Sequence, residues 1–144
     1  NVNQNTFNEI TKRTRKKAAW AIDELRALQT MQARNRKTLR TLRGSFAGAF
    51  GMPQFIPSSF VHWARPYKKD TVPNLVNPSD AIYSVGYYLS DSGWKRGQVN
   101  TYVPALLRYN NSNDYANAIL KLASRVDGLS LQRGPTGEEN FQIP

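Results

Sequence analysis

Apolar residues recur at helical spacing in several parts of the chain, and these periods predict a mostly α-helical protein. Between Lys16 and Met31 the apolar positions stand three or four residues apart with charged residues between them, which predicts an amphipathic helix. A second, basic helix is expected over residues 35–43, ended by Gly44. Residues 1–14 are polar and weakly patterned, so no element is predicted for them.

The clearest helix boundaries lie between Asn77 and Gly93. The Asn77 side chain can cap a helix that has Pro78 in its first turn, and Asp80 is placed to favour the exposed amide groups there. Gly93 is expected to end this helix.

Two more helices are predicted in the last third of the chain. One covers residues 102–109, and the other follows Ser112 as its cap and stops before Gly128. The second places its apolar residues on one side: Ala116, Ile119, Leu120, Ala123 and Val126. No stretch shows a convincing strand period. Residues 129–144 show no period at all and are expected to form an irregular tail that wraps or frays.

The length and composition of the chain indicate one globular domain. It has 144 residues, of which 40% are apolar and 21% charged, so a single compact domain over residues 1–144 is expected. No apolar run approaches the roughly 20 residues that cross a bilayer. No signal peptide is visible, but Asn1 is not an initiator methionine. We therefore expect an N-terminal portion of the domain to precede residue 1.

The charge distribution and the counts of cysteine and histidine limit the kinds of site that the chain can form. There is no cysteine, which excludes disulfides, thiol nucleophiles and zinc–thiolate sites, and any imidazole chemistry depends on His62 alone. Residues 1–43 carry eleven Lys or Arg against Glu9, Asp23 and Glu24, which is +8 of the net charge of +10. Such a surface attracts polyanions such as nucleic acid, acidic lipid or an anionic cell-wall polymer. A well-solvated helical face is the alternative interpretation.

One segment, "GSFAGAFGMPQFIPSSF" at residues 44–60, is too broken for a long helix and too apolar for an ordinary loop. Its glycines, alanines and serines let the backbone pass close to another surface, either a neighbouring element or a ligand lying in a groove. Gln54 in the middle has two interpretations. Its amide can recognise hydroxyls and amides of a sugar, or it can be satisfied internally and brace the loop.

The order of residues in this segment resembles the signature of the lytic transglycosylase B family, peptidoglycan-cleaving enzymes with a lysozyme-like α fold. The resemblance continues through "NPSDAIYSVGYYLSDSGWKRG" at 77–97 and "LLRYNNSNDYANAILKLA" at 106–123. It covers roughly residues 18–126. It implies a lysozyme-like, lytic transglycosylase catalytic-domain fold.

The resemblance also implies roles for individual residues. Ser45 would lie at the catalytic subsite and hydrogen-bond the sugar or its reacting N-acetyl group, and Gln54 would bind a saccharide amide or hydroxyl. Tyr88 matches a tyrosine whose hydroxyl contacts the catalytic carboxyl group. The other implied glycan contacts are Ala47, Gly48, Phe55, Tyr109, Asn110 and Tyr115. Core packing with a hydroxyl at the rim is the alternative role for the tyrosines.

The chain departs from the family pattern in its catalytic acid. The family uses one glutamate, several tens of residues before the signature segment, and that position precedes Asn1 in this numbering. We expect the acid there, with Glu9 as a weak fallback. A glycan-binding relic that has lost its acid is the alternative. Asp23 and Glu24 lie in the first predicted helix, where solvated or structural roles are expected.

A second departure concerns metal binding. Some family members hold calcium in an acidic loop at the position of residues 66–80. Lys68, Lys69 and Val72 stand here where oxygen ligands would be needed, and calcium requires six to eight oxygens. The sequence therefore predicts no metal and no cofactor.

The expected function is cleavage of the β-1,4 bond between N-acetylmuramic acid and N-acetylglucosamine, by a lytic transglycosylase that forms 1,6-anhydro ends. The alternatives are a lysozyme-type hydrolase on the same scaffold and a non-catalytic wall-binding module. The expected partners are peptidoglycan glycan strands, with electrostatic adsorption to anionic wall and no nucleic acid. We expect the protein to be a monomer that is periplasmic or secreted. The sequence leaves open whether an upstream segment anchors it.

Overall fold

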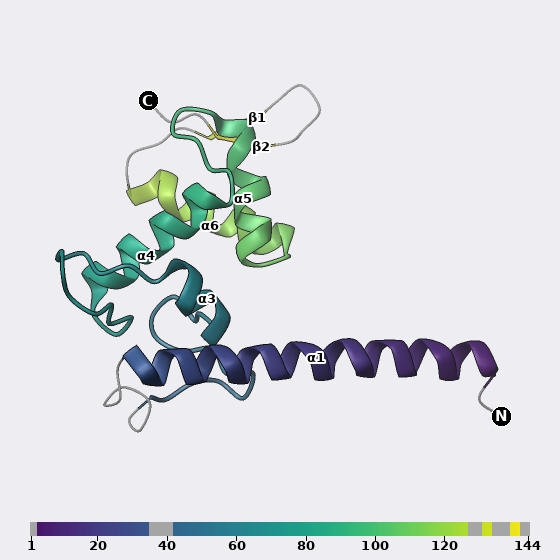
Figure 1. The fold of residues 1–144 in the computed structure, drawn as a ribbon. Coiled ribbons are helices and arrows are strands. Elements are labelled where there is room, and N and C mark those ends of the chain that lie inside the picture. The colour runs from purple at the N-terminus through teal and green to yellow at the C-terminus, as the bar shows by residue number, and fades with distance from the viewer. Residues whose placement is uncertain (1–2, 35–41, 127–130, 134–138, 142–144) are drawn as a thin grey trace. The chain divides into compact units, whose positions relative to one another are not determined.

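The computed structural model describes residues 3–34, 42–126, 131–133 and 139–141, and it is mostly helical, as predicted (Figure 1). The chain divides into two compact units, residues 1–85 and 86–144. In chain order, the elements are α1 (Gln4–Arg34), α3 (Pro57–Trp63), α4 (Pro78–Asp91), η1 (Val99–Thr101), α5 (Tyr102–Tyr109), α6 (Asn113–Val126), β1 (Leu131–Arg133) and β2 (Glu139–Phe141). The boundary between the units falls within helix α4. Within the described residues, no helix has the length and apolarity that a membrane span requires.

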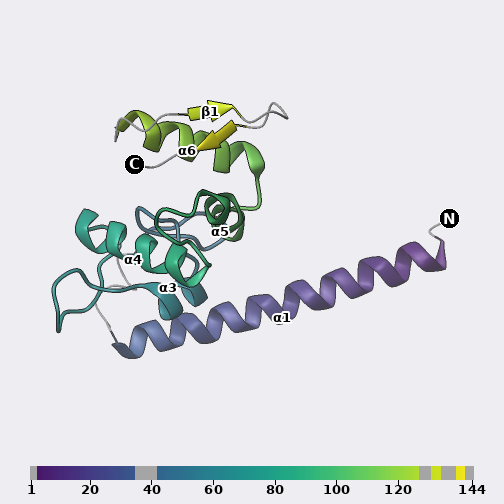
Figure 2. The same cartoon turned by 90° about the horizontal axis from the view of Figure 1, so that it is seen from above.

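Helix α1 is much longer than the predicted amphipathic segment. It begins after Asn3, whose Oδ1 accepts a hydrogen bond from the amide of Asn5 at 2.9 Å. The first turns lack an apolar period, but their lysines, arginines, Gln4 and Glu9 are good helix formers, and propensity extends the helix. Figure 2 shows one unbroken helix whose first half extends beyond α3.

The face of α1 that packs differs from the face that its apolar period predicts. Ile22 and Leu25 are 50% and 65% exposed, whereas Met31, near the end of the helix, is 3% exposed. Glu24 and Leu28 are half-buried on the packed side. The contact with α3 therefore decides which face of α1 faces the core.

The core of the first unit is aromatic and lies around the signature segment, residues 44–60. Phe50, Phe55 and Leu75 are 2–3% exposed, and the rings of Phe50 and Phe60 stand 5.5 Å apart. Helix α3, which is not predicted from the sequence, begins within this segment at Pro57. The basic helix predicted over 35–43 lies mostly outside the described residues, and its last two positions are not helical.

Two residues of α4 fasten the loop at 64–77 in the first unit. Ser84 is fully buried, and its hydroxyl accepts from the Arg65 amide at 3.0 Å and donates to the Arg65 carbonyl at 3.1 Å. The Asp80 carboxylate accepts from the amides of Tyr67 and Asn74, both at 2.8 Å. Asp80 thus binds loop amides rather than the first turn of α4, whose cap is Asn77 as predicted: its Oδ1 accepts from Ser79 at 2.9 Å.

The second unit has its own core, formed where α5 and α6 meet. Its four most buried members are Tyr102, Leu106, Ala116 and Leu120. The Trp94 ring stacks on that of Tyr102 at 3.9 Å, and the Tyr102 hydroxyl accepts from the Gly97 amide at 3.0 Å. The predicted bounds of the short helix over 102–109 are confirmed.

Helix α6 follows the predicted cap, because the Ser112 hydroxyl accepts from the Tyr115 amide at 3.2 Å. Val126, the last residue of the predicted apolar side, is 76% exposed. Gly128 lies outside the described residues. Within the tail, the described residues form β1 and β2, which pair antiparallel with Leu131 opposite Phe141. The strands are three residues each, too short for a sequence period to reveal.

Candidate functional site

The start of the signature segment is a tight turn built around Ser45. The Ser45 amide donates to the Ala49 carbonyl at 2.8 Å, and the Gly48 amide donates to the Ser45 carbonyl at 2.9 Å. The Ser45 hydroxyl oxygen accepts from the Ala49 amide at 3.2 Å. Because no described residue accepts the hydroxyl hydrogen, this exposed group remains a donor that a ligand can use.

Two glycines of the segment serve different purposes. Both have positive φ, +81° at Gly48 and +71° at Gly51, where side chains are strained. A Cβ on Gly48 would meet nothing within 4 Å, so its backbone is open to a ligand. A Cβ on Gly51 would stand 2.6 Å from the Leu75 Cβ. Gly51 therefore uses the close approach that a small residue permits to pack against Leu75, whereas the backbone at Gly48 stays open.

Gln54 braces the turn in this structure. Its φ is +54°, and its backbone amide donates to the Gly51 carbonyl at 3.2 Å. Its Nε2 donates to the same carbonyl at 2.8 Å, which is the internally satisfied arrangement. The side chain is exposed, however, and one amide hydrogen and the Oε1 acceptor have no partner among the described residues. Bracing is therefore observed, and glycan binding stays a prediction.

The remaining predicted residues of this segment differ in their exposure. Ala47 is exposed beside Gly48, but the ring of Phe55 is 3% exposed, and its carbonyl accepts from the Phe50 amide at 2.9 Å. Phe55 thus supports the segment from within. Sequence reasoning missed Phe46, which lies on the same turn as Ser45 with its ring fully exposed. Its place next to Ser45 was the available signal.

Three predicted tyrosines form one cluster in the second unit. The rings of Tyr88 and Tyr109 meet edge to face at 5.2 Å and 87°. Those of Tyr109 and Tyr115 are nearly parallel, 6° apart, at 6.4 Å. The Tyr88 hydroxyl donates to the Arg108 carbonyl at 2.7 Å, which fixes its direction.

Burial controls the protonation of this cluster. It raises the pKa of Tyr88, and hydrogen bonding to Ser92 and the positive charge of Arg108 offset only part of that rise. The pKa of Tyr109 is raised further, by burial first and then by its neighbours Tyr115 and Tyr88. Both hydroxyls therefore stay protonated donors at neutral pH.

Asn110 ends α5 next to this cluster. It is exposed, its amide donates to the Leu106 carbonyl at 2.9 Å, and its carbonyl accepts from the Ser112 amide at 2.7 Å. Tyr88, Tyr109, Asn110 and Tyr115 all lie in the second unit, and Ser45, Ala47, Gly48, Gln54 and Phe55 lie in the first. Each set is brought together within its unit. The glycan-binding roles that the resemblance implies for the two sets stay predictions.

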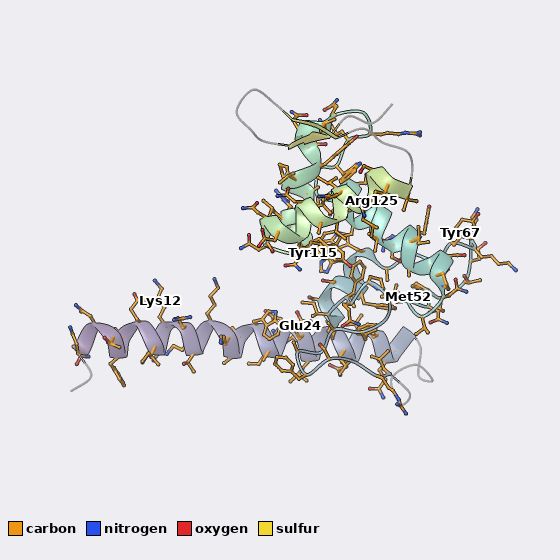
Figure 3. All side chains as sticks on the ribbon, turned by 180° about the vertical axis from the view of Figure 1, so that it is seen from behind. Lys12, Glu24, Met52, Tyr67, Tyr115 and Arg125 are labelled. Atoms are coloured by element: carbon orange, nitrogen blue, oxygen red, sulfur yellow. The ribbon has the colours of Figure 1, made fainter. Side chains whose placement is uncertain are left out.

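The carboxylates of the first unit have identifiable surroundings. Glu24 binds Ser58, with Oε2 accepting from the backbone amide at 2.9 Å and Oε1 from the hydroxyl at 2.7 Å. Figure 3 labels Glu24 on α1. Asp23 pairs with Arg26 at 3.0 Å on the surface, and Glu9 is exposed. The structural role expected for Glu24 is thus observed.

Known proteins resemble both the sequence and the fold. Residues 5–105 match the family model described as Transglycosylase SLT domain. The membrane-bound lytic murein transglycosylase B of Escherichia coli (strain K12) is 48% identical over 56 residues, which are 39% of this chain and 16% of that protein. This sequence similarity supports the resemblance to the lytic transglycosylase B family.

Two solved structures share the fold. The catenated lytic transglycosylase SltB1 from Pseudomonas aeruginosa has a TM-score of 0.70 at 23% identity, with 78% of this chain and 58% of that chain covered. A 36 kDa muramidase/transglycosylase has a TM-score of 0.69 at 24% identity, with 78% and 55% covered. The chain therefore spans little more than half of these structures. Its fold is the expected lytic transglycosylase fold, and by the match over residues 5–105 the chain belongs to the transglycosylase SLT domain family.

Proposed function

We propose that this chain forms part of an enzyme that cleaves the β-1,4 bond between N-acetylmuramic acid and N-acetylglucosamine in peptidoglycan, leaving 1,6-anhydro ends. The observation that carries the proposal is the geometry of the Ser45 turn within a chain of the transglycosylase SLT domain family. The turn presents a Ser45 hydroxyl whose hydrogen no described residue accepts, beside the open backbone of Gly48. A sugar N-acetyl group can approach such a surface closely and accept a hydrogen bond there.

In this proposal the two units contribute different groups. Ser45 donates to the N-acetyl or ring substituents of the reacting sugar, and Gln54 offers its free amide hydrogen and Oε1. The cluster of Tyr88, Tyr109 and Tyr115 supplies ring faces to the glycan strand, with Asn110 at its edge. The Tyr88 hydroxyl, which donates to the Arg108 carbonyl, holds its ring in place within the cluster. Phe55 acts only by holding the segment in place.

The proposed acid is a single glutamate outside residues 1–144. Two carboxylates of the first unit are already engaged, Glu24 with Ser58 and Asp80 with loop amides. The acid would donate its proton to the leaving glycosidic oxygen and then, as a base, take the proton of the muramic 6-hydroxyl. That oxygen attacks the anomeric carbon, so the anhydro ring closes without water.

The test is digestion of purified peptidoglycan by a longer protein containing this chain, with the products analysed by mass spectrometry. Anhydro-muramic ends support the proposal. Hydrated reducing ends would replace it with a lysozyme-type hydrolysis at the same site. Retained binding without cleavage would make the chain a wall-binding module. The matched variant is Ser45→Ala, which keeps the turn backbone and should lower kcat by about tenfold to a hundredfold if Ser45 contacts the reacting sugar.

We also propose that the enzyme acts at the cell envelope as a monomer and is held there by charge. Helix α1 carries five exposed basic residues in two turns, and Figure 3 shows Lys12 pointing away from the helix. The wall carries carboxylates and phosphates, and exposed charges of this kind attract such polymers. Adsorption to purified wall should weaken steeply as salt shortens the screening length, and salt-independent adsorption would contradict this part.

A further inference from the structure

The first unit carries a pair of exposed tyrosines, Tyr67 on the loop at 64–77 and Tyr83 on helix α4. The side chains of Tyr67 and Tyr83 are 70% and 52% exposed, yet their rings meet edge to face at 6.2 Å and 82°. An edge-to-face contact covers at most one ring face, so the other faces remain open to solvent. Figure 3 shows Tyr67 at the periphery of the unit.

The pair is held by a hydrogen-bonded frame that includes one fully buried side chain, Ser84. The Tyr67 amide is bound by the Asp80 carboxylate at 2.8 Å. Two residues earlier, the amide and carbonyl of Arg65 are both bound by the Ser84 hydroxyl, which has no exposed surface. Since Asp80, Tyr83 and Ser84 all belong to α4, the two rings are fixed on neighbouring backbones. Their presentation is therefore pre-organised, and little entropy is lost when a ligand binds.

The charge beside the pair indicates the kind of ligand. Lys68 and Lys69 follow Tyr67 directly and are exposed, and within the described residues neither forms an ion pair. Asp70 offsets one charge, while the Asp80 carboxylate already accepts two backbone amides. A ligand that suits this surface has apolar C–H faces for the rings, hydroxyls for the tyrosine oxygens, and carboxylates for the ammonium groups. An anionic amino-sugar polymer has all three.

We propose that Tyr67 and Tyr83, with Lys68 and Lys69, form an auxiliary binding surface for peptidoglycan strands, separate from the residues assigned to cleavage. This rests on the proposed function for the identity of the polymer. The surface would hold the enzyme on an insoluble substrate between cleavage events. None of its residues belongs to the predicted site.

The experiment measures adsorption of the 144-residue chain to purified peptidoglycan sacculi and to uncharged chitin by co-sedimentation. Tyr67→Ala/Tyr83→Ala should weaken binding to both polymers by about tenfold, since two aromatic contacts are lost. Tyr67→Phe/Tyr83→Phe should retain most binding. Lys68→Ala/Lys69→Ala should weaken binding to sacculi and leave chitin unaffected. Ile82→Ala is the matched control, because its side chain is 73% exposed on the same helix and carries no ring.

Several results would overturn this proposal. One is equal loss with Ile82→Ala, which would indicate non-specific apolar contact. Another is unchanged binding of the double alanine variant while its thermal unfolding matches that of the unaltered chain. Concentration-dependent association that the alanine variant abolishes would identify the pair as a contact between copies. A further test needs no substitution. Bound sacculi should protect Tyr67 and Tyr83 from chemical nitration, which mass spectrometry maps. Cleavage is judged separately by its products, so either proposal can fail alone.

Discussion

Replacing Glu24 tests whether a long-range hydrogen-bonded contact holds the signature segment in place. Helix α3 has no side-chain cap of its own, because its N-cap residue is Ile56. The Glu24 carboxylate, on α1, supplies that function by accepting from the amide and the hydroxyl of Ser58 at 2.9 and 2.7 Å. The alanine variant would remove both bonds and leave an amide of the first turn of α3 without its acceptor.

The magnitude follows from the number and type of these bonds. Two hydrogen bonds to a carboxylate would contribute about 3–6 kcal/mol if fully buried, but Glu24 is only half-buried and water can replace it in part. We therefore expect Glu24→Ala to lower the free energy of unfolding by about 2 kcal/mol, the upper end for the loss of a cap. Glu24→Gln keeps one acceptor and should lose about 1 kcal/mol, as should Ser58→Ala.

The assay is urea unfolding followed by circular dichroism, with the m value checked for constancy. Asp23→Ala is the matched control on the adjacent residue, whose ion pair with Arg26 is exposed and should contribute less than about 0.5 kcal/mol. The double variant Glu24→Ala/Ser58→Ala should be less destabilised than the sum of the single variants, by about 1 kcal/mol. Equal effects at positions 23 and 24, or strict additivity with Ser58, would refute the reasoning.

The remaining predictions concern the turn, the loop and the tyrosines. Gly51→Ala should destabilise the protein by about 3 kcal/mol, because the new Cβ would stand 2.6 Å from the Leu75 Cβ. Gly48→Ala should cost about 1 kcal/mol, because its Cβ would meet nothing within 4 Å. The midpoints of urea unfolding compare the two variants. Asp80→Ala frees two loop amides, so trypsin should cut after the loop lysines faster than in Asp80→Asn, which keeps one acceptor. Burial raises the pKa of Tyr88 and Tyr109 above the ordinary 10.0, so stability should be full below that pH and fall as pH rises above it. In thermal unfolding measured across about pH 9–11, the stability of Tyr109→Phe should decline less steeply with pH than that of the unaltered chain. An unchanged decline would contradict the raised pKa of Tyr109.

Local signals in the sequence predicted the second half of the fold well. The caps at Asn77 and Ser112 and the bounds of the helix at 102–109 are all observed. Each depends on hydrogen bonds or packing between residues a few positions apart, and such interactions are the same in any fold. The same reasoning missed α3 and the short strands, whose few residues carry no measurable period.

The candidate site was predicted as a set of residue types, but its arrangement was not. The small residues around Ser45 indicated a close backbone approach, and the structure shows that Gly51 approaches Leu75 while Gly48 stays open. Spacing alone does not distinguish the two interpretations of Gln54, sugar recognition and bracing of the loop. The hydrogen bond from its Nε2 to the Gly51 carbonyl demonstrates the bracing role. A side chain's direction depends on its rotamer and its neighbours, which spacing does not encode.

The sequence by itself determined the helical class, the family signature and the cationic character of the first third, because composition, order and period are properties of the chain alone. Only the tertiary structure decided which face of α1 is packed, since Ile22 and Leu25 have the right period and are exposed nonetheless. It also decided that Glu24 binds Ser58, 34 residues away, and that Tyr67 meets Tyr83. These contacts join residues distant in sequence, and their energies depend on burial and geometry that arise only when the chain has folded.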